Sequence, residues 1–394
     1  MIRIAHASDL HCSERHRLDD WKALHGVFVE QMEEAKVNLI LLAGDLFHAR
    51  STPAERNAMA EFLIAASRVA PVVIAKGNHD AAGDLDIFGR LGGDARVTVM
   101  DRPGVERIWP VYGRAGAAGS STRVIALPWF DKAHLVAGLD ATQDAQTTAN
   151  ATVDAARSLL TTLRAHASEA RAAGDIPILV GHVMLGGSVV STGQVLIGQG
   201  VELSPSDILD VGCEYAALGH IHKAQSWFAG RVAYSGSTWR QNFGEAEPKG
   251  WRLVTFDDEG KFAGAEFMEL PARNIVLIEA DFTRNERIQY EMENIPGSLV
   301  RVRYLVAAEK LHEVDEAHIR EQLLSDGAHE VTLEAIVEHQ ARVRSELIVE
   351  AKDSWSKIEA WLTAKEIAID EPTRERIRAK LSTIETAQAR DVTA

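Results

Sequence analysis

The alternation of apolar and polar positions in the first half of the chain predicts strands separated by helices. Short runs of β-branched residues and leucine are typical of buried strands, whereas longer segments with apolar residues three and four apart are typical of helices. The predicted strands are Ile2–Ala7, Val37–Ala43, Pro71–Ala75, Arg123–Leu127, Ile176–Val180, Tyr215–Leu218, Arg231–Tyr234 and Trp251–Phe256. The predicted helices are Asp19–Lys36, Pro53–Ser67 and Asp140–Ala173. Strands that alternate with helices in this way indicate a layered α/β domain.

The pattern changes near Pro271, where a smaller α/β unit is predicted to begin. Its predicted strands are Asn274–Ala280, Leu299–Leu305 and Glu330–Val337, and its predicted helices are Asn285–Glu293 and Ala317–Leu324. From Ala341 the spacing of apolar residues predicts a helical tail, and Pro372 after Asp370 predicts the start of a second tail helix. We therefore predict three domains, which span residues 1–270, 271–340 and 341–394.

Composition narrows the classes of protein that fit this chain of 394 residues. No run of 18 apolar residues is present, so we expect no membrane span. Two cysteines are too few for a disulfide framework and favour a cytoplasmic protein. The net charge of -15 argues against a nucleic-acid substrate, because binding of phosphates normally needs a basic surface. Taken alone, it favours a small-molecule substrate or a partner that supplies positive charge.

The segment from Lys223 to Arg252 has the opposite balance of charge. Its basic residues Lys223, Arg231, Arg240, Lys249 and Arg252 outnumber its acidic residues Glu245 and Glu247. A weakly basic surface here would suit a phosphate backbone. A solvated face of no functional importance explains the same charges equally well.

Five short motifs place aspartate, histidine or asparagine directly after a predicted strand. They are Asp9-Leu10-His11, Gly44-Asp45, Gly77-Asn78-His79-Asp80, Gly181-His182 and Gly219-His220-Ile221-His222. Any one of them is an ordinary turn or cap sequence. Together they are predicted to converge, because ligands bind at the carboxyl ends of strands in open α/β sheets. Mixed carboxylate, imidazole and amide groups suit Mn or Fe better than Mg or Ca, so the motifs predict a site for two divalent transition metals.

The five motifs, in this order from Asp9 to His222, resemble those of the calcineurin-like metallophosphoesterase superfamily. The resemblance is closer to the SbcD-type nucleases of DNA double-strand-break repair. It is carried by His6–His11 at the start of the chain, by Gly44–His48, and by Ser235–Thr238 followed by Asn242–Glu245. This resemblance implies a two-sheet sandwich flanked by helices, a small α/β capping domain and a C-terminal helical tail.

The resemblance also implies a role for each matching residue. The first metal would be held by Asp9, His11 and His222, with Asp45 bridging both ions, and the second by Asn78, His182 and His220. His79, oriented by Asp80, would stabilise the transition state and protonate the leaving oxygen. His48 would assist the leaving group or hold the substrate. Phosphodiesters would be hydrolysed by hydroxide generated between the two metals.

The function that the resemblance implies is a Mn-dependent DNA exonuclease and endonuclease. It would be the nuclease subunit of an SbcCD-like repair or recombination complex, a homodimer whose C-terminal helices dock on an SbcC-like, SMC-type ATPase, with no membrane partner. Exposure of Trp355 or Trp361 would support docking, whereas amphipathic helices usually pack on their own chain. The first alternative is a small-molecule phosphodiesterase or phosphatase on the same scaffold. The second is a DNA-end scaffold with a degenerate site, which is disfavoured because no predicted ligand is missing.

Overall fold

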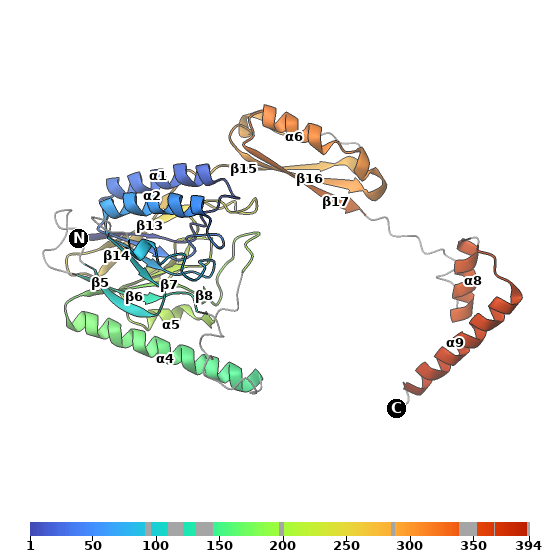
Figure 1. Ribbon diagram of the computed structural model, residues 1–394, viewed down its shortest axis with the longest axis horizontal. Helices are drawn as coiled ribbons and strands as arrows, with labels where there is room; N and C mark the ends of the chain where they lie inside the picture. Colours follow the sequence, from blue (N-terminus) through green and yellow to red (C-terminus); the bar gives the residue numbers. More distant parts are fainter. Residues whose placement is uncertain are drawn as a thin grey trace. The chain divides into compact units, whose positions relative to one another are not determined.

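The apolar strands of the first part of the chain form two six-stranded sheets in the computed structural model (Figure 1). The first sheet has the order β14 (Phe262–Glu269), β13 (Gly250–Phe256), β1 (Ile2–Ala7), β2 (Leu39–Ala43), β3 (Val72–Ala75) and β4 (Val97–Met100). The second has the order β11 (Gln225–Trp227), β12 (Val232–Tyr234), β10 (Tyr215–Gly219), β7 (Ile176–His182), β6 (Thr122–Leu127) and β5 (Gly104–Ile108). Strands β1 to β4 run parallel to one another in the first sheet, and β12, β10, β7 and β6 run parallel to one another in the second.

The structure describes residues 1–90, 96–108, 121–130, 145–196, 201–284, 288–338, 353–365 and 367–391. By their internal contacts these residues divide into two units, Met1–Ile275 and Val276–Ala394. The division of the chain into three domains stays a prediction. Within the described ranges, no helix has the length and apolar character needed to cross a membrane.

Helices cover the outer face of each sheet of the first unit (Figure 1). On β2, Ile40 and Leu42 face a core shared with Phe28 and Phe62, whereas Leu41 faces the opposite sheet. Both faces of the strand are therefore buried, which explains its unbroken apolar run. The α-helices of this unit within the described ranges are α1 (Leu18–Glu34), α2 (Pro53–Val69), α4 (Ala145–Ala172) and α5 (Pro205–Leu209). The predicted sandwich of two sheets flanked by helices is confirmed.

The predicted order of strands and helices is correct for the interior of both sheets. In these two sheets the strands that were not predicted, β14, β4, β11 and β5, are the four outermost ones, and the separate two-stranded sheet of β8 (Met184–Leu185) and β9 (Glu202–Leu203) was not predicted either. An outermost strand has one neighbour and is partly exposed, so its side chains show a weaker apolar pattern. Position in the sheet therefore explains these omissions.

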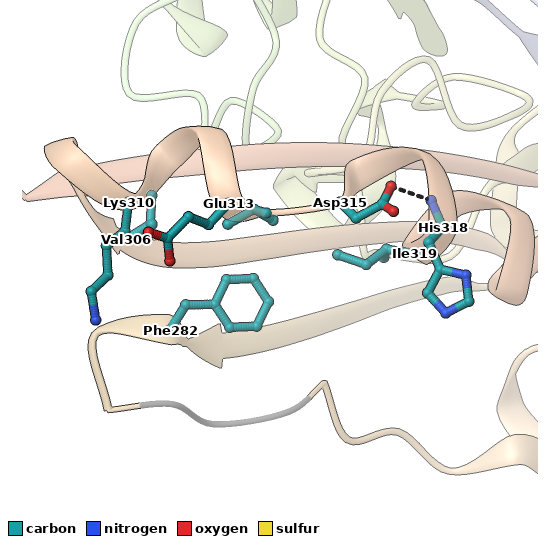
Figure 2. A pocket seen from close by; sticks show the side chains of 8 residues that line it. Phe282, Val306, Lys310, Glu313, Asp315, His318 and Ile319 are labelled. Carbon is teal, nitrogen blue, oxygen red and sulfur yellow. Dashed lines mark hydrogen bonds between the residues drawn. The ribbon is translucent and has the colours of Figure 1, made fainter.

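The second unit contains a three-stranded sheet with the order β15 (Ile275–Asp281), β16 (Leu299–Ala307) and β17 (Glu330–Glu338). The helix α6 (Glu316–Ser325) connects the parallel strands β16 and β17. Asp315 caps this helix by accepting the backbone N–H of His318 at 2.9 Å, and Figure 2 shows Phe282 pointing into a hollow beside it. Two further helices, α8 (Ser354–Ala364) and α9 (Glu371–Asp391), contain the predicted tail segments around Trp355 and after Asp370.

The helix predicted over Asn285–Glu293 is wrong where the structure describes it. Residues 285–287 lie outside the described ranges, and the segment from Ile288 has only one turn of 3-10 helix, Met292–Asn294. Ile288 and Tyr290 are half-buried and Gln289 between them is exposed, so the apolar spacing is two residues rather than that of a helix. The tail helix predicted to start at Ala341 also lies outside the described ranges as far as residue 352.

Candidate metal centre

The carboxyl ends of five strands bring the predicted site residues together. Asp9 and His11 follow β1, Asp45 follows β2, and Asn78 follows β3 in the first sheet. In the second sheet, His182 ends β7, and His220 and His222 follow β10. Within each sheet these strands run parallel to one another, which explains why residues far apart in the sequence meet at one edge.

Three of the predicted ligands, Asp9, His11 and His222, form the first group. One ligand atom from each lies within 4.8 Å of the others. Nε2 of His222 lies 3.2 Å from Nε2 of His11 and 4.0 Å from Oδ1 of Asp9. All three side chains are buried, so their polar atoms face one another rather than solvent.

Asp45 lies between this group and a second one. Its Oδ2 is 3.7 Å from Nε2 of His11 and 3.3 Å from Nε2 of His182. The amide oxygen of Asn78 is 2.9 Å from Nε2 of His182 and 3.1 Å from Nδ1 of His220. The arrangement therefore has two sets of ligand atoms with one carboxylate between them, as a pair of bridged cations would need.

His79 and His48 lie beside the first group. Ring nitrogens of His11, His48 and His79 fall within 4.8 Å of one another. Nδ1 of His79 donates to the backbone carbonyl of His48 at 2.6 Å, which leaves Nε2 as the nitrogen that faces Asp45, at 4.0 Å. Burial, together with the His16 and His79 imidazoles, lowers the pKa of His48 to about 4.

Asp80 has a different structural role from the one expected. Its carboxylate accepts the backbone N–H groups of Asp45, Leu46, Phe47 and Gly77 at 2.9–3.1 Å. Within the described part of the chain, all of its hydrogen bonds are to backbone N–H groups, and His79 is oriented by the carbonyl of His48 instead. Asp80 therefore braces the loop that carries Asp45, and the expectation that it orients His79 is corrected.

Several of these residues have strained backbone conformations. The φ angles of Asp9, His11, Asp45 and His220 are 54°, 42°, 53° and 106°, a region that residues other than glycine rarely adopt. Hydrogen bonds hold the strained loops together, because the N–H of Asp9 donates to Gly44 and that of His11 donates to Asp45. Gly44, with a φ of 86°, must be glycine because a Cβ there would overlap the His182 ring. Such strain is typical of functional sites.

The charge of the site favours a bound cation. Asp9 and Asp45 are buried, and no lysine or arginine pairs with either among the residues that the structure describes. Burial lowers the pKa of His182, but the adjacent Asp45 outweighs this effect and raises it to about 9. Buried carboxylates need a cationic partner, and the mixture of carboxylate, imidazole and amide donors fits divalent transition metals.

Two residues that contact the ligands were not predicted to act there: Glu245 lies behind the first group, and Trp129 lies beside His220 of the second. Glu245 is buried and its Oε1 accepts Nδ1 of His222 at 2.9 Å. Burial raises the pKa of Glu245, but this hydrogen bond and the charge of Lys249 outweigh burial and lower it. The only sequence signal was the presence of Glu245 in the motif that carries the resemblance. Trp129 follows the end of β6 and its ring centroid lies 4.9 Å from that of His220, so its position after a strand was a usable signal.

The basic surface considered for residues 223–252 is not supported. Lys249 and Arg252 are 1% and 9% exposed, and Arg240 is half-buried with its guanidinium bonded to backbone carbonyls. Lys249 pairs instead with Glu245 and Glu247. Lys249 and Arg252 are therefore part of the interior, and of the five cations of the segment only Lys223 is exposed, so its positive balance does not describe a basic surface.

Residues 2–224 match the calcineurin-like phosphoesterases, so the chain belongs to this family of metal-dependent phosphoesterases. The matched region contains the whole of the candidate metal centre. Several curated relatives are named as the SbcD component of the nuclease SbcCD. The protein of that name from Rhodobacter capsulatus is 32% identical over 259 residues, which cover 60% of this chain and 62% of that protein.

Two further relatives with the same name match over longer stretches. The Staphylococcus epidermidis protein is 23% identical over 74% of this chain and 77% of its own length, and the Escherichia coli protein is 27% identical over 68% of each. Among solved structures, the Plasmodium protein GAP50 has a TM-score of 0.38 at 14% identity and covers 68% of this chain and 89% of its own. A dimetal phosphatase from Danio rerio has a TM-score of 0.38 at 10% identity, and the match covers 68% of this chain and 97% of that protein.

Proposed function

We propose that the protein is a DNA nuclease that uses two divalent metal ions, most favourably Mn²⁺, to hydrolyse phosphodiesters. The observation that carries this proposal is the position of Asp45 between two groups of ligand atoms, Asp9, His11 and His222 on one side and Asn78, His182 and His220 on the other. Bound metal ions would lower the pKa of water and neutralise charge on the phosphoryl group. The curated relatives are named as a subunit of a nuclease, which supports a nucleic acid as the substrate.

The side chains beside these ligands indicate which group would protonate the leaving oxygen. Nδ1 of His79 donates a hydrogen bond to the carbonyl of His48. Nε2 is therefore the atom that can hold a proton and pass it to the leaving oxygen. His48, with a pKa of about 4, is neutral at pH 7 and is better suited to hold the substrate than to donate a proton. Asp80 contributes by fixing the loop around Asp45.

The second candidate function is hydrolysis of a small phosphodiester or phosphomonoester. It is favoured by the net charge of -15 and by the burial of Lys249 and Arg252, which leaves little basic surface beside the site. Two features would allow DNA binding in spite of this negative charge. The bound cations would offset part of it near the site, and a partner would supply further positive charge.

The test is cleavage of end-labelled linear duplex and single-stranded DNA with Mn²⁺, Mg²⁺ or EDTA, with bis-p-nitrophenyl phosphate in parallel. We expect metal-dependent DNA cleavage that falls at least 100-fold in His79→Ala. His166→Ala, on α4 with its ring 3.5 Å from the Glu169 carboxylate, is the matched control and is expected to keep wild-type activity. Cleavage of the small diester with DNA left intact, even with an ATPase partner present, would support the second candidate.

The C-terminal helices are the proposed docking element for an SbcC-like ATPase. Arg378 of α9 lies over the Trp355 ring of α8, with 4.5 Å between its guanidinium carbon and the ring centroid, whereas Trp361 is 47% exposed. An exposed tryptophan on a helical hairpin is a suitable interface anchor. Trp361→Ala is expected to weaken co-purification with the coiled-coil ATPase at least 10-fold, and Phe228→Ala, at an exposed aromatic residue of the first unit, serves as a control. The homodimer and the capping role of residues 271–340 stay predictions.

A further inference from the structure

Glu245 is a fully buried glutamate that lies behind the metal centre, in a segment without regular structure between β12 and β13. Its Oε1 accepts Nδ1 of His222 at 2.9 Å and Nδ2 of Asn242 at 3.1 Å. Its Oε2 accepts the backbone N–H of Gln241 at 2.9 Å and lies 2.9 Å from Nζ of Lys249. Three hydrogen bonds and one ion pair thus surround a carboxylate that has no access to solvent.

Lys249 completes the environment of this carboxylate. Its side chain is buried, and its Nζ donates to Ser237 at 2.9 Å, to Glu247 at 2.8 Å and to the backbone carbonyl of His222 at 3.3 Å. His222 is therefore held at two points, its ring by Glu245 and its main chain by Lys249. A buried ion pair is weak evidence for added stability, because desolvation of both charges offsets their attraction. The pair is therefore better explained by its contacts with His222.

The chemistry of the contact indicates this role. A carboxylate only accepts hydrogen bonds, so Nδ1 of His222 must carry the proton and Nε2 keeps a free lone pair. Nε2 is the nitrogen that faces His11 and Asp9. We propose that Glu245 is a positioning residue that fixes the tautomer and ring orientation of His222 as a metal ligand, and that Lys249 holds Glu245 in place. The proposal rests on the two-metal function proposed above.

Isothermal titration of the full, EDTA-stripped chain with MnCl₂ tests the proposal without measuring catalysis. The wild-type chain is expected to bind two ions. Glu245→Ala is expected to weaken one of these binding events about 10- to 100-fold and to leave the other unchanged. His222→Ala should weaken the same binding event. In the His222→Ala background, Glu245→Ala should cause little further loss of Mn²⁺ affinity, because both substitutions act on one ligand. Glu214→Gln, a largely buried glutamate paired with Arg171 and Lys261, is the matched control.

A charge-balanced variant separates positioning from folding. Glu245→Gln combined with Lys249→Met removes the buried ion pair as a unit but keeps an oxygen that can accept Nδ1 of His222. This double variant is expected to bind Mn²⁺ within about 10-fold of the wild-type chain and more tightly than Glu245→Ala. The proposal is overturned if Glu245→Ala binds both ions as the wild type does, or if it weakens binding further when His222 is already alanine. A wild-type chain that binds no Mn²⁺ instead refutes the two-metal function itself.

Discussion

Acidification is expected to destabilise the fold through His25, a buried histidine of α1 that lies outside the ligand set. Nδ1 of His25 bonds the carbonyl of Trp21 at 2.7 Å, and Nε2 lies 3.1 Å from the hydroxyl oxygen of Thr238. Burial lowers the pKa of this imidazole to about 3, although the bond to Trp21 opposes the shift. Trp21 in turn donates its indole N–H to the carbonyl of Leu10, so this packing supports the loop that carries Asp9 and His11.

The size of the effect follows from the two pKa values. In the unfolded chain His25 takes up a proton below its ordinary pKa of 6.5, whereas in the folded chain it stays neutral down to about pH 3. The free energy of unfolding is therefore unaffected above pH 6.5 and falls as the pH drops towards 3. At pH 5 the unfolded state gains about 2 kcal/mol from this one group. That is a substantial part of the 5–15 kcal/mol, roughly, that stabilises a typical domain.

Urea unfolding in EDTA at pH 8 and pH 5, followed by tryptophan fluorescence, measures this contribution. His25→Leu is expected to be less stable than wild type at pH 8, because Thr238 loses its partner. Its further loss between pH 8 and pH 5 should be about 2 kcal/mol smaller than that of wild type. His318→Leu, at an exposed position on α6, should lose as much as wild type does. An equal pH-dependent loss in wild type and His25→Leu would show that the buried imidazole does not set the acid sensitivity.

Three further outcomes are expected. Gly77→Ala would push a Cβ into the Asp45 carboxylate, so Mn²⁺ affinity measured by titration should fall at least 10-fold, and wild-type affinity would contradict the geometry. Asp80→Asn replaces one acceptor oxygen by an NH₂ group that faces two backbone N–H groups, and it should reduce Mn²⁺ affinity roughly 10- to 100-fold. The control Asp84→Asn disturbs a single backbone contact and should reduce Mn²⁺ affinity by less than about threefold. Arg378→Ala removes the cation above a tryptophan ring of α8, so hydrogen exchange in α8 and α9 should speed up by the equivalent of about 0.5–1 kcal/mol; unchanged exchange would mean that this contact contributes nothing.

The interior of the fold was predictable because its strands are buried on both faces. Runs such as Leu39–Ala43 and Val72–Ala75 are continuously apolar, and helices with apolar faces lie between them in the sequence. The outermost strands were missed because contact with one neighbour leaves their side chains partly exposed, as in Phe262–Glu269. The segment from Ile288 was misassigned because its spacing of two was taken for a helical one.

The candidate metal centre was predictable in its membership but not in its supporting contacts. Strand ends with Asp, His and Asn can be recognised in a sequence, because topology alone brings them together. The partners of Asp80 are backbone N–H groups of Gly77 and of residues 45–47, and a contact with a backbone N–H leaves no mark in the sequence. Likewise, Glu245 and Lys249 are two opposite charges among others in the sequence, and only the fold shows that both are buried.

The supporting contacts explain how the strained centre keeps its geometry. Left-handed conformations at residues such as Asp9 and Asp45 destabilise the fold by roughly 1–3 kcal/mol each, and persist only where surrounding contacts hold them. Here the loops after β1 and β2 hydrogen-bond to each other, and Asp80 fixes the second loop through three of its backbone N–H groups. The ligand atoms are thus placed by main-chain contacts, so binding of metal ions requires side-chain adjustment and loss of protons rather than refolding of the loops. Substitution of a brace such as Asp80 should therefore impair metal binding although the residue itself is no ligand.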